Sequence, residues 1–434
     1  MLMKAQILLA YLAIATAAAH QFGERFRWKI VEIAWPSDEI KTQVFDRNDY
    51  VPVNNAIAGI KVWKGMMYLT VPRWKPGVPV TLGVIPSELI MKEIPPKLQA
   101  YPTWEMQTVG DCRAFQFVQS MEIDPLGRMW VLDTGRTATM TTEPKARCNP
   151  RLVILDLENN GAVLRNIPFP ESVTPHNESY LNDIVLDSTD GGFAYISDTN
   201  DRDPGIIVFS LEKNRSWKVR HDSMKKQKEA EDFFIGDERV IKGIPIDGIA
   251  LSPLDAYERY VYYCPLSSYH LYSVNTVALK EEGVTNIDRY IREVGRKSSQ
   301  TDGMMMSANG TLYFGLLADD AVALWDSERD VSFTTGQRII GRDHVRMQWP
   351  DSFAIDDNGY LWCTTNALHN FMHNKIDPRQ VNYRISRLVI DNFSYQYHMN
   401  GTAPELPVII AGADDRVPVA ISTFIFFILA IAVQ

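Results

Sequence analysis

Cysteine is scarce in this chain of 434 residues, and its four cysteines form no Cys-x-x-Cys pair. A structural zinc site is therefore not expected, because such sites usually need closely spaced thiolates. Basic residues are also in the minority, with 44 Lys and Arg against 53 Asp and Glu. The net charge of -9 argues against a nucleic-acid partner, because binding to phosphates needs a basic surface.

Several catalytic motifs are missing as well. The chain has no Gly-x-Ser-x-Gly elbow, no Walker loop and no dinucleotide fingerprint, so serine-hydrolase and nucleotide-dependent chemistry are not indicated. His369 and His373 have the spacing of a helical metal pair, but no Glu follows the first His as a zinc protease requires. We interpret that spacing as coincidental.

The two ends of the chain carry export signals. Lys4 precedes an apolar run that ends in three alanines, the pattern of a secretory signal peptide over residues 1–19. Residues 411–434 form a C-terminal tail whose last eighteen residues, 417–434, are uncharged. This hydrophobic tail is a GPI signal, a single membrane span or a last buried strand. The sequence thus predicts an extracellular protein, either secreted or anchored at the cell surface.

Sequons and cysteines agree with export. Five Asn-x-Ser/Thr sequons predict N-glycosylation at Asn177, Asn214, Asn309, Asn392 and Asn400. In an oxidising compartment four cysteines predict two disulfides, with three connectivities open. The most economical connectivity pairs Cys112 with Cys148, which are close along the chain, and leaves Cys264 with Cys363.

One sequence unit recurs six times. It consists of a small polar or acidic residue, an apolar run, a turn with Gly, Asp or Asn, and a segment centred on an aromatic residue. Residues 301–313 and 350–362 align without a gap, and both contain Asn-Gly, the strongest short hairpin signal. The aromatic centres of all six copies are at positions 68, 130, 195, 262, 313 and 362.

The spacing of these copies predicts the fold. Successive aromatic centres are 62, 65, 67, 51 and 49 residues apart, enough for four strands of about six residues with their loops. Sheet-rich repeats of this length favour a β-propeller over a solenoid. We therefore predict an all-β fold, a six-bladed β-propeller with four-stranded blades around a central channel, as a single domain over residues 20–410.

Five segments carry a family resemblance: Pro72–Pro79, Gly127–Gly135, Tyr180–Val185, Ala194–Asp198 and Val381–Ile385. Together they are similar to the insect yellow / major royal jelly protein family, over about residues 28–410. The resemblance implies a secreted six-bladed propeller associated with cuticle pigmentation, dopachrome conversion, binding of biogenic amines, or food storage. The chain departs from the family at Leu324, where a cysteine often precedes the tryptophan. The second disulfide therefore rests on cysteine parity alone.

The first strand of each propeller blade lines the channel, so equivalent residues converge at one mouth. The aligned copies place five polar residues at one such position: Gln119, Asn182, Asp247, Asp302 and Asp351. These residues either cap strand ends and turns or form a ring that binds a cation. We predict a ligand site at this ring, with Phe353 as an aromatic contact and Trp349 and Phe314 as further stacking candidates.

Three classes of function stay open for such a ring. The leading prediction is a binding protein for a small aromatic amine or catechol-derived metabolite, without a resident cofactor. The alternative from the enzyme class is dopachrome conversion, with a ring carboxylate as the base and His176 or His344 as a candidate partner. A non-catalytic cuticle structural or signalling role is the third. Calcium ranks last, although a ring of oxygens could supply its ligands, as in lactonase-type propellers.

Overall fold

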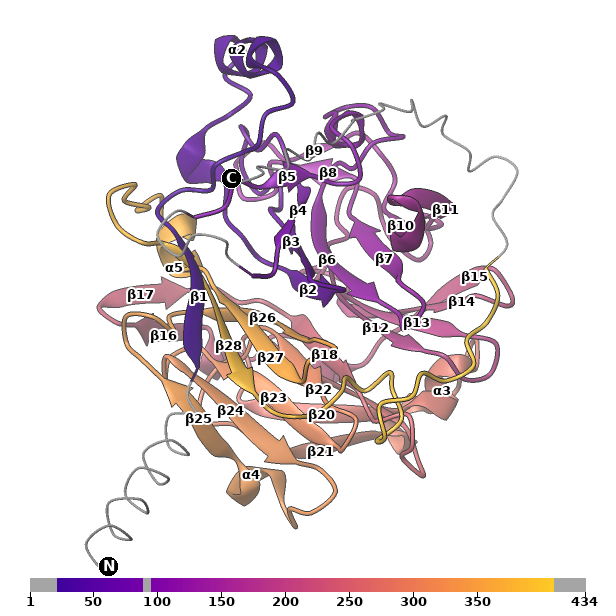
Figure 1. Cartoon of the computed structure of the whole chain (residues 1–434). Coiled ribbons are helices and arrows are strands. Elements are labelled where there is room, and N and C mark those ends of the chain that lie inside the picture. Colours follow the sequence, from indigo (N-terminus) through magenta and orange to yellow (C-terminus); the bar gives the residue numbers. More distant parts are fainter. Residues whose placement is uncertain (1–21, 89–94, 410–434) are drawn as a thin grey trace, which may run out of the picture.

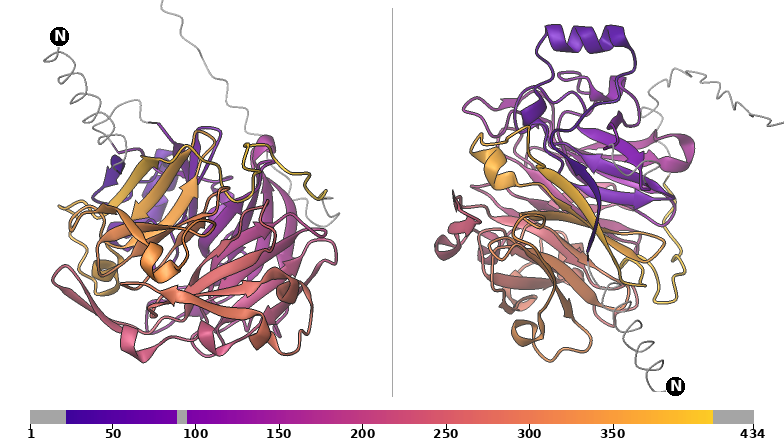
Figure 2. Two further views of the ribbon diagram at one scale, coloured as in Figure 1. Left: turned by 90° about the horizontal axis from the view of Figure 1, so that it is seen from below. Right: turned by 60° about the vertical axis from the view of Figure 1, so that its left-hand side comes forward.

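The computed structural model describes residues 22–88 and 95–409. The predicted signal peptide and the hydrophobic tail lie outside these residues. Six antiparallel four-stranded sheets stand around a common axis as the blades of a propeller (Figures 1 and 2). The predicted all-β, six-bladed fold is confirmed.

Each blade is described from its inner strand outward. Blade 1 contains β2 (Ile60–Trp63), β3 (Met66–Thr70), β4 (Leu82–Pro86) and β5 (Gln99–Ala100). Blade 2 contains β6 (Val118–Ile123), β7 (Arg128–Asp133), β10 (Arg151–Asp156) and β11 (Ala162–Pro168). Blade 3 contains β12 (Leu181–Asp187), β13 (Phe193–Asp198), β14 (Gly205–Ser210) and β15 (Arg215–Val219).

The second half of the propeller repeats this order. Blade 4 contains β18 (Ile246–Leu251), β19 (Tyr260–Pro265), β20 (His270–Asn275) and β21 (Ile291–Arg296). Blade 5 contains β22 (Met304–Met306), β23 (Thr311–Leu316), β24 (Ala321–Asp326) and β25 (Arg338–Arg342). Blade 6 contains β26 (Pro350–Ile355), β27 (Tyr360–Thr365), β28 (Tyr383–Val389) and β1 (Gly23–Trp28).

The remaining elements are short insertions between blade strands. Two hairpins are β8 (Arg136–Thr137) with β9 (Lys145–Ala146), and β16 (Asp232–Ile235) with β17 (Glu238–Ile241). The helices are α2 (Asp38–Asp46), α3 (Thr276–Lys280), α4 (Phe333–Gly336) and α5 (Leu368–Met372). Helix α2 projects away from the blades (Figure 1).

Each sequence repeat forms the inner hairpin of one blade. The six aromatic centres lie in the second strands, β3, β7, β13, β19, β23 and β27. Strands β7, β13 and β23 are buried along their whole length, because neighbouring blades cover both faces of the sheet. The turns between the hairpin strands use Gly310 and Gly359 at φ of +83° and +73°, a backbone region that glycine enters without steric cost.

The propeller is closed by the N-terminal strand. Strand β1 pairs with β28 and so becomes the outermost strand of the last blade, with Trp28 opposite Tyr383. Phe26 and Trp28 are buried, and the Trp28 indole donates to the carbonyl oxygen of Pro96 at 2.9 Å. The first described strand therefore joins blade 6 to the loops of blade 1.

Only one of the two predicted disulfides is present among the described residues. Cys112 and Cys148 are bonded, as predicted, whereas Cys264 and Cys363 are free and buried. Their predicted pairing is wrong because Cys264 lies in β19 of blade 4 and Cys363 in β27 of blade 6, with blade 5 between them. Burial raises the pKa of both thiols, so they behave as small apolar residues of the core.

The segment after β28 crosses the channel end that lies opposite the start of the inner strands. The Tyr395 backbone donates to the Met306 carbonyl at 3.1 Å, and the Tyr395 hydroxyl accepts from the Leu186 amide at 2.8 Å. Gln396 donates to the Ile123 carbonyl at 2.9 Å. Three inner strands are thereby tied together, and the fully buried Tyr395 closes this end of the channel.

The predicted glycosylation sites lie on the surface. Asn177, Asn214, Asn309 and Asn400 are exposed and Asn392 is half-buried, so glycosylation stays a prediction that their exposure permits. Within residues 22–88 and 95–409, no helix is long and apolar enough to cross a membrane.

Candidate functional site

The five predicted ring residues lie where the inner strands bulge or begin. In blades 2, 3, 4 and 6 two residues oppose one on the second strand, at positions 119–120, 182–183, 247–248 and 351–352. In blade 5, Asp302 lies just before β22. A bulge changes the direction of the side chains that it contains. The same local irregularity therefore recurs at the ring position of four blades.

Two glycines next to the ring let neighbouring blades approach closely. A Cβ atom on Gly248 would lie 2.1 Å from the carbonyl oxygen of Asp302, and one on Gly303 would lie 2.0 Å from that of Asp351. Only a residue without a side chain fits at such a distance. Each of these Asp-Gly pairs thus supplies a carboxylate to the ring. Its glycine also allows the backbone of the next ring aspartate to approach closely.

The ring forms the floor of a cavity of about 510 Å³, which we call the mouth cavity. All five ring residues line it: Gln119, Asn182, Asp247, Asp302 and Asp351. Three aromatic rings contribute to its wall, those of Tyr180, Trp74 and Trp349. The Tyr180 side chain is half-buried, whereas both tryptophans are buried. Arg136, Lys226 and Lys242 place cations around it, together with the carboxylates of Glu178 and Asp201.

A hydrogen-bond network fixes the ring side chains. Asn182 donates to Asp247 at 2.7 Å, and the Trp349 indole donates to Asp302 at 2.6 Å. Asn366 donates to Asp351 at 2.5 Å. On the far side, the Tyr180 hydroxyl donates to the Gln119 amide oxygen at 2.9 Å. Each ring carboxylate therefore has a neutral donor.

The three aspartates are electrostatically costly. Burial raises the pKa of Asp247, Asp302 and Asp351 well above the usual value, and their mutual repulsion raises it further. Asp247 and Asp302 lie close enough for each to affect the pKa of the other. No Lys or Arg of the described chain forms an ion pair with any of the three. The floor of the mouth cavity thus carries three buried carboxyl groups that no cationic side chain of the described residues pairs with.

The channel beneath the ring is filled. Lys61 forms an ion pair with Glu122 at 3.0 Å and donates to the Phe353 carbonyl at 3.4 Å. Asp183 accepts from Ser120 at 3.2 Å and from the Ile249 amide at the same distance. The remaining space measures about 20 Å³, so the mouth cavity is blind at its inner end.

Some predicted contacts do not reach the mouth cavity. Phe353 is buried two residues below Asp351 and lines the filled channel, and Phe314 packs on Phe333 in the core. Phe353 follows the bulge at positions 351–352, which interrupts the strand alternation, and Phe314 lies in β23, the second strand of blade 5. His176 pairs with Glu171, and His344 with Asp320, both away from the mouth cavity.

Other residues of the mouth cavity were not predicted from sequence. Tyr180 is two positions before Asn182, and this period-two spacing was a usable signal. Trp74 comes from a loop and Arg136 from β8 of a short inserted hairpin, and neither follows the register of a blade strand. His369 stacks behind Trp349 with ring centroids 6.4 Å apart, and burial lowers its pKa to about 4. A neutral, buried His369 supports the indole rather than binding a metal with His373.

Within residues 22–88 and 95–409, no three His, Cys, Asp or Glu side chains are arranged so that they could hold a metal ion. Calcium binding at the ring stays a prediction.

Comparison with known proteins places the chain in a family. A family model described as major royal jelly protein matches residues 116–396. The chain belongs to the major royal jelly protein family. Protein yellow of Drosophila subobscura is 31% identical over 398 residues, which cover 87% of this chain and 68% of that protein. Protein yellow of Drosophila melanogaster is 30% identical over 399 residues, which cover 88% and 72%.

Solved structures are more distant from this major royal jelly family member. A luciferin-regenerating enzyme has 11% identity and a TM-score of 0.46, with 82% of this chain and 99% of that chain covered. Regucalcin of Agrobacterium tumefaciens, a calcium-binding protein, has 11% identity and a TM-score of 0.45, covering 82% and 93%. Neither likeness carries an argument about ligands.

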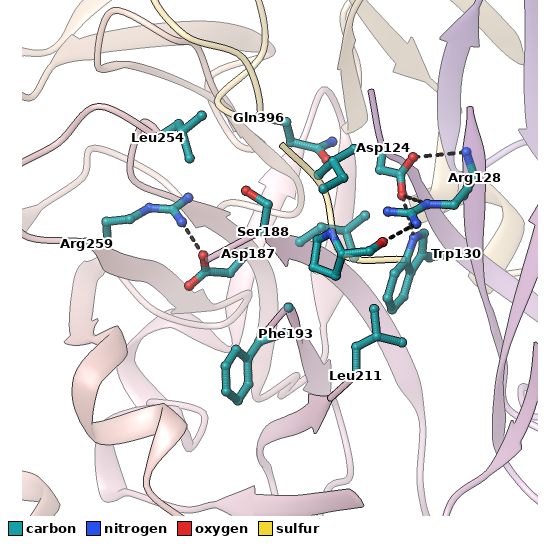
Figure 3. Close-up of a pocket in the computed structure, with 14 residues that line it drawn as sticks. Asp124, Arg128, Trp130, Asp187, Ser188, Phe193, Leu211, Leu254, Arg259 and Gln396 are labelled. Carbon is teal, nitrogen blue, oxygen red and sulfur yellow. Dashed lines mark hydrogen bonds and ion pairs between the residues drawn. The ribbon is translucent and has the colours of Figure 1, made fainter. Parts of the chain in front are cut away.

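In this major royal jelly family member, the matched range 116–396 contains the whole ring, but Trp74 lies outside it. A further pocket at the opposite channel end is small, about 20 Å³. There Asp124 pairs with Arg128, and Asp187 pairs with Arg259 (Figure 3). Arg128 also donates to the carbonyl of Pro407 at 2.6 Å. Because these charges are satisfied, we assign this pocket a structural role, the docking of the C-terminal segment.

Proposed function

We propose that the mouth cavity binds a small organic ammonium ligand that carries an aromatic ring, of the aromatic amine or catechol-derived class. The observation that carries this proposal is the group of three buried aspartates without a cationic partner. An ammonium group would supply the missing positive charge, and Tyr180 would offer a ring face for stacking or cation–π contact. A cavity of about 510 Å³ is of the size that small-molecule sites have.

Family membership supports the same proposal. Relatives of this chain are proteins named yellow, and the resemblance implies pigmentation-related biology outside the cell. We propose that this protein is secreted or anchored at the surface and acts there on amine- or catechol-derived metabolites. Secretion of the full chain from insect cells, with a loss of mass on enzymatic deglycosylation, tests the location.

Isothermal titration calorimetry with dopamine and serotonin tests the binding proposal. We expect the wild type to show a heat of amine binding. The amine affinity of Asp302→Asn and of Asp351→Asn should be at least about tenfold weaker. Asp222→Asn is the matched control, because Asp222 is exposed and pairs with Lys225 outside the mouth cavity. Absence of heat with the wild type, or equal affinity in all four proteins, would refute the proposal.

Dopachrome conversion is the second candidate, and one observation favours it. Asp247 and Asp302 lie together at the floor of the mouth cavity, and both have raised pKa values. A carboxyl pair of this kind can accept and return a proton during tautomerisation. Loss of dopachrome absorbance with purified protein tests this activity. A wild-type rate equal to the buffer rate excludes it and leaves the binding proposal intact.

A further inference from the structure

A second cavity, of about 530 Å³, lies beside the mouth cavity, and we call it the basic pocket. Its walls come from the loop after α2, from residues 73–79, from residues 104–109 and from the β8–β9 hairpin. It shares a wall with the mouth cavity. Trp74 lines the mouth cavity, whereas its neighbours Arg73 and Lys75 line the basic pocket.

The charge of the basic pocket is opposite to that of the whole chain. Its ionisable lining consists of five cations and one carboxylate: Arg47, Arg73, Lys75, Lys145, Arg147 and Asp49. The whole chain has a net charge of -9. A concave site with this local excess of positive charge concentrates anions even on an acidic protein.

Two of the cations are fixed in the wall of the basic pocket. Arg73 is buried and donates to the carbonyl oxygens of Gln116 at 2.9 Å and Val78 at 2.9 Å, among others. Lys75 donates to the Asn374 side chain at 2.8 Å and lies 3.9 Å from the centre of the Phe371 ring. Neither cation has a carboxylate within ion-pair distance among the described residues. Their positive charge is therefore not neutralised locally.

The other three cations are exposed and unpaired. Arg47, Lys145 and Arg147 form no ion pair and no side-chain hydrogen bond within the part of the chain that the structure describes. The nearby Arg113, by contrast, pairs with Asp111 at 2.8 Å. Exposed cations that line one cavity and have no ion-pair partner among the described residues are suited to bind an anion from solution.

The disulfide holds two walls of the basic pocket together. Cys112 follows the 104–109 segment, and Cys148 follows Arg147 directly. Trp104, which is half-buried against Trp35 with ring centroids 5.7 Å apart, adds an aromatic face to the pocket. The pocket therefore joins a cationic surface to a platform for the organic part of a ligand.

We propose that the basic pocket binds a small organic polyanion that carries two or more phosphate or sulfate ester groups. Arg47, Lys145 and Arg147 contact the ester oxygens, while Arg73 and Lys75 supply fixed positive potential from the wall. Trp104 packs against the organic body. This site is distinct from the mouth cavity, whose floor is acidic.

Binding of two probes to the full mature protein tests the proposal. Inositol hexakisphosphate represents phosphate esters, and sucrose octasulfate represents sulfate esters. We expect at least one probe to bind, with affinity that falls as salt rises. The variant Arg47→Gln/Lys145→Gln/Arg147→Gln should bind at least about 30-fold more weakly, because three charge-assisted contacts are lost.

The matched control removes the same number of charges elsewhere. Lys29→Gln/Lys213→Gln/Arg329→Gln changes three exposed cations outside the basic pocket, and we expect its affinity to stay within about threefold of wild type. Binding of only one probe identifies the ester class. Equal weakening in both triple variants, or no binding of either probe to the wild type at low salt, would overturn the proposal. Amine binding is measured separately, so its failure leaves this result unaffected.

Discussion

A buried carboxyl group without a cationic partner lowers the stability of a fold when it is ionised, and the Asp302 side chain allows this effect to be measured. Its pKa is raised by burial and by the neighbouring Asp247. Asp302→Asn removes the ionisable group and keeps an oxygen for the Trp349 indole. We expect the free energy of unfolding at pH 7 to rise by on the order of 1 kcal/mol, the value of one pKa unit.

Urea unfolding at two pH values checks this expectation. A carboxyl group with a raised folded-state pKa binds more protons in the folded than in the unfolded state. Its destabilising effect therefore develops as pH rises above the unfolded value and is absent at lower pH. The advantage of Asp302→Asn should disappear near pH 4. A variant less stable than wild type at pH 7 would contradict the expectation.

The proposed amine binding should depend on pH through the same three aspartates. Only ionised carboxylates attract an ammonium group, and burial raises the pKa of Asp247, Asp302 and Asp351. Amine affinity should therefore increase from about pH 5 to pH 8, with release of protons on binding. Calorimetry in buffers of different ionisation enthalpy measures that release. Affinity that is constant with pH would show that the ring is already ionised.

Individual residues show which parts of the site could be predicted from the sequence and which could not. The five ring residues were found because they share a repeat position, and a repeat position becomes a shared place in space once the blades close. Phe353 lies in the filled channel and not in the mouth cavity, because the bulge at positions 351–352 interrupts the alternation of side chains. The Cys264–Cys363 pair failed because cysteine parity carries no information on which blades are neighbours.

At the scale of elements, the bulged inner strand is what turns a repeat into a site. Gly248→Ala tests it, because Gly248 lies in the bulge at positions 247–248 and the added Cβ would lie 2.1 Å from the Asp302 carbonyl oxygen. We expect a loss of about 1–3 kcal/mol or more in stability, as for an overpacked core, together with weaker amine binding. Gly23→Ala is the control, since its Cβ would have its nearest neighbour at 3.9 Å. Thermal melting of both variants decides the point, and equal melting temperatures would contradict it.

The Cys112–Cys148 bridge is the second element that can be tested. It joins residues 36 apart in sequence, for which the chain-entropy model gives roughly 4 kcal/mol of stabilisation. We expect Cys112→Ser/Cys148→Ser to unfold at lower urea concentration and to bind the polyanion probe more weakly, because two walls of the basic pocket separate. Cys264→Ser, which removes a free thiol, is the control that should keep polyanion binding.

Strand elements were predictable, but their irregularities were not. The hairpins were visible because Asn-Gly turns and aromatic centres repeat. The bulges at positions 182–183 and 247–248 leave no residue pattern that a period-two count detects, since one extra residue resembles a shift in register. The loop that carries Trp74 and the short β8–β9 hairpin that carries Arg136 lie outside the blade repeat, so the repeat does not predict their place at the mouth cavity.

At the scale of the whole molecule, six repeats predict six blades, but they do not predict which strand closes the ring. The repeat units begin at residue 58, whereas closure uses Gly23–Trp28. A closed propeller needs its last blade completed, because an unpaired edge on β28 would leave backbone groups without partners. Closure therefore depends on a segment that lies outside every repeat.

Substitution of Trp28 tests how much the closure contributes. Trp28 is buried in β1, opposite Tyr383, and its indole donates to the carbonyl oxygen of Pro96, which lies between β4 and β5 of blade 1. Trp28→Ala should lower stability by about 3–5 kcal/mol, as for a large buried aromatic residue. Arg27→Ala, on the exposed face of the same strand, should change the stability by less than about 0.5 kcal/mol.

If closure of the propeller is a requirement for the whole ring, Trp28→Ala should also weaken amine binding, although Trp28 does not line the mouth cavity. Urea unfolding and calorimetry on the same two variants measure both effects. Full amine affinity in a destabilised Trp28→Ala would mean that the ring of aspartates holds its shape without a sealed last blade.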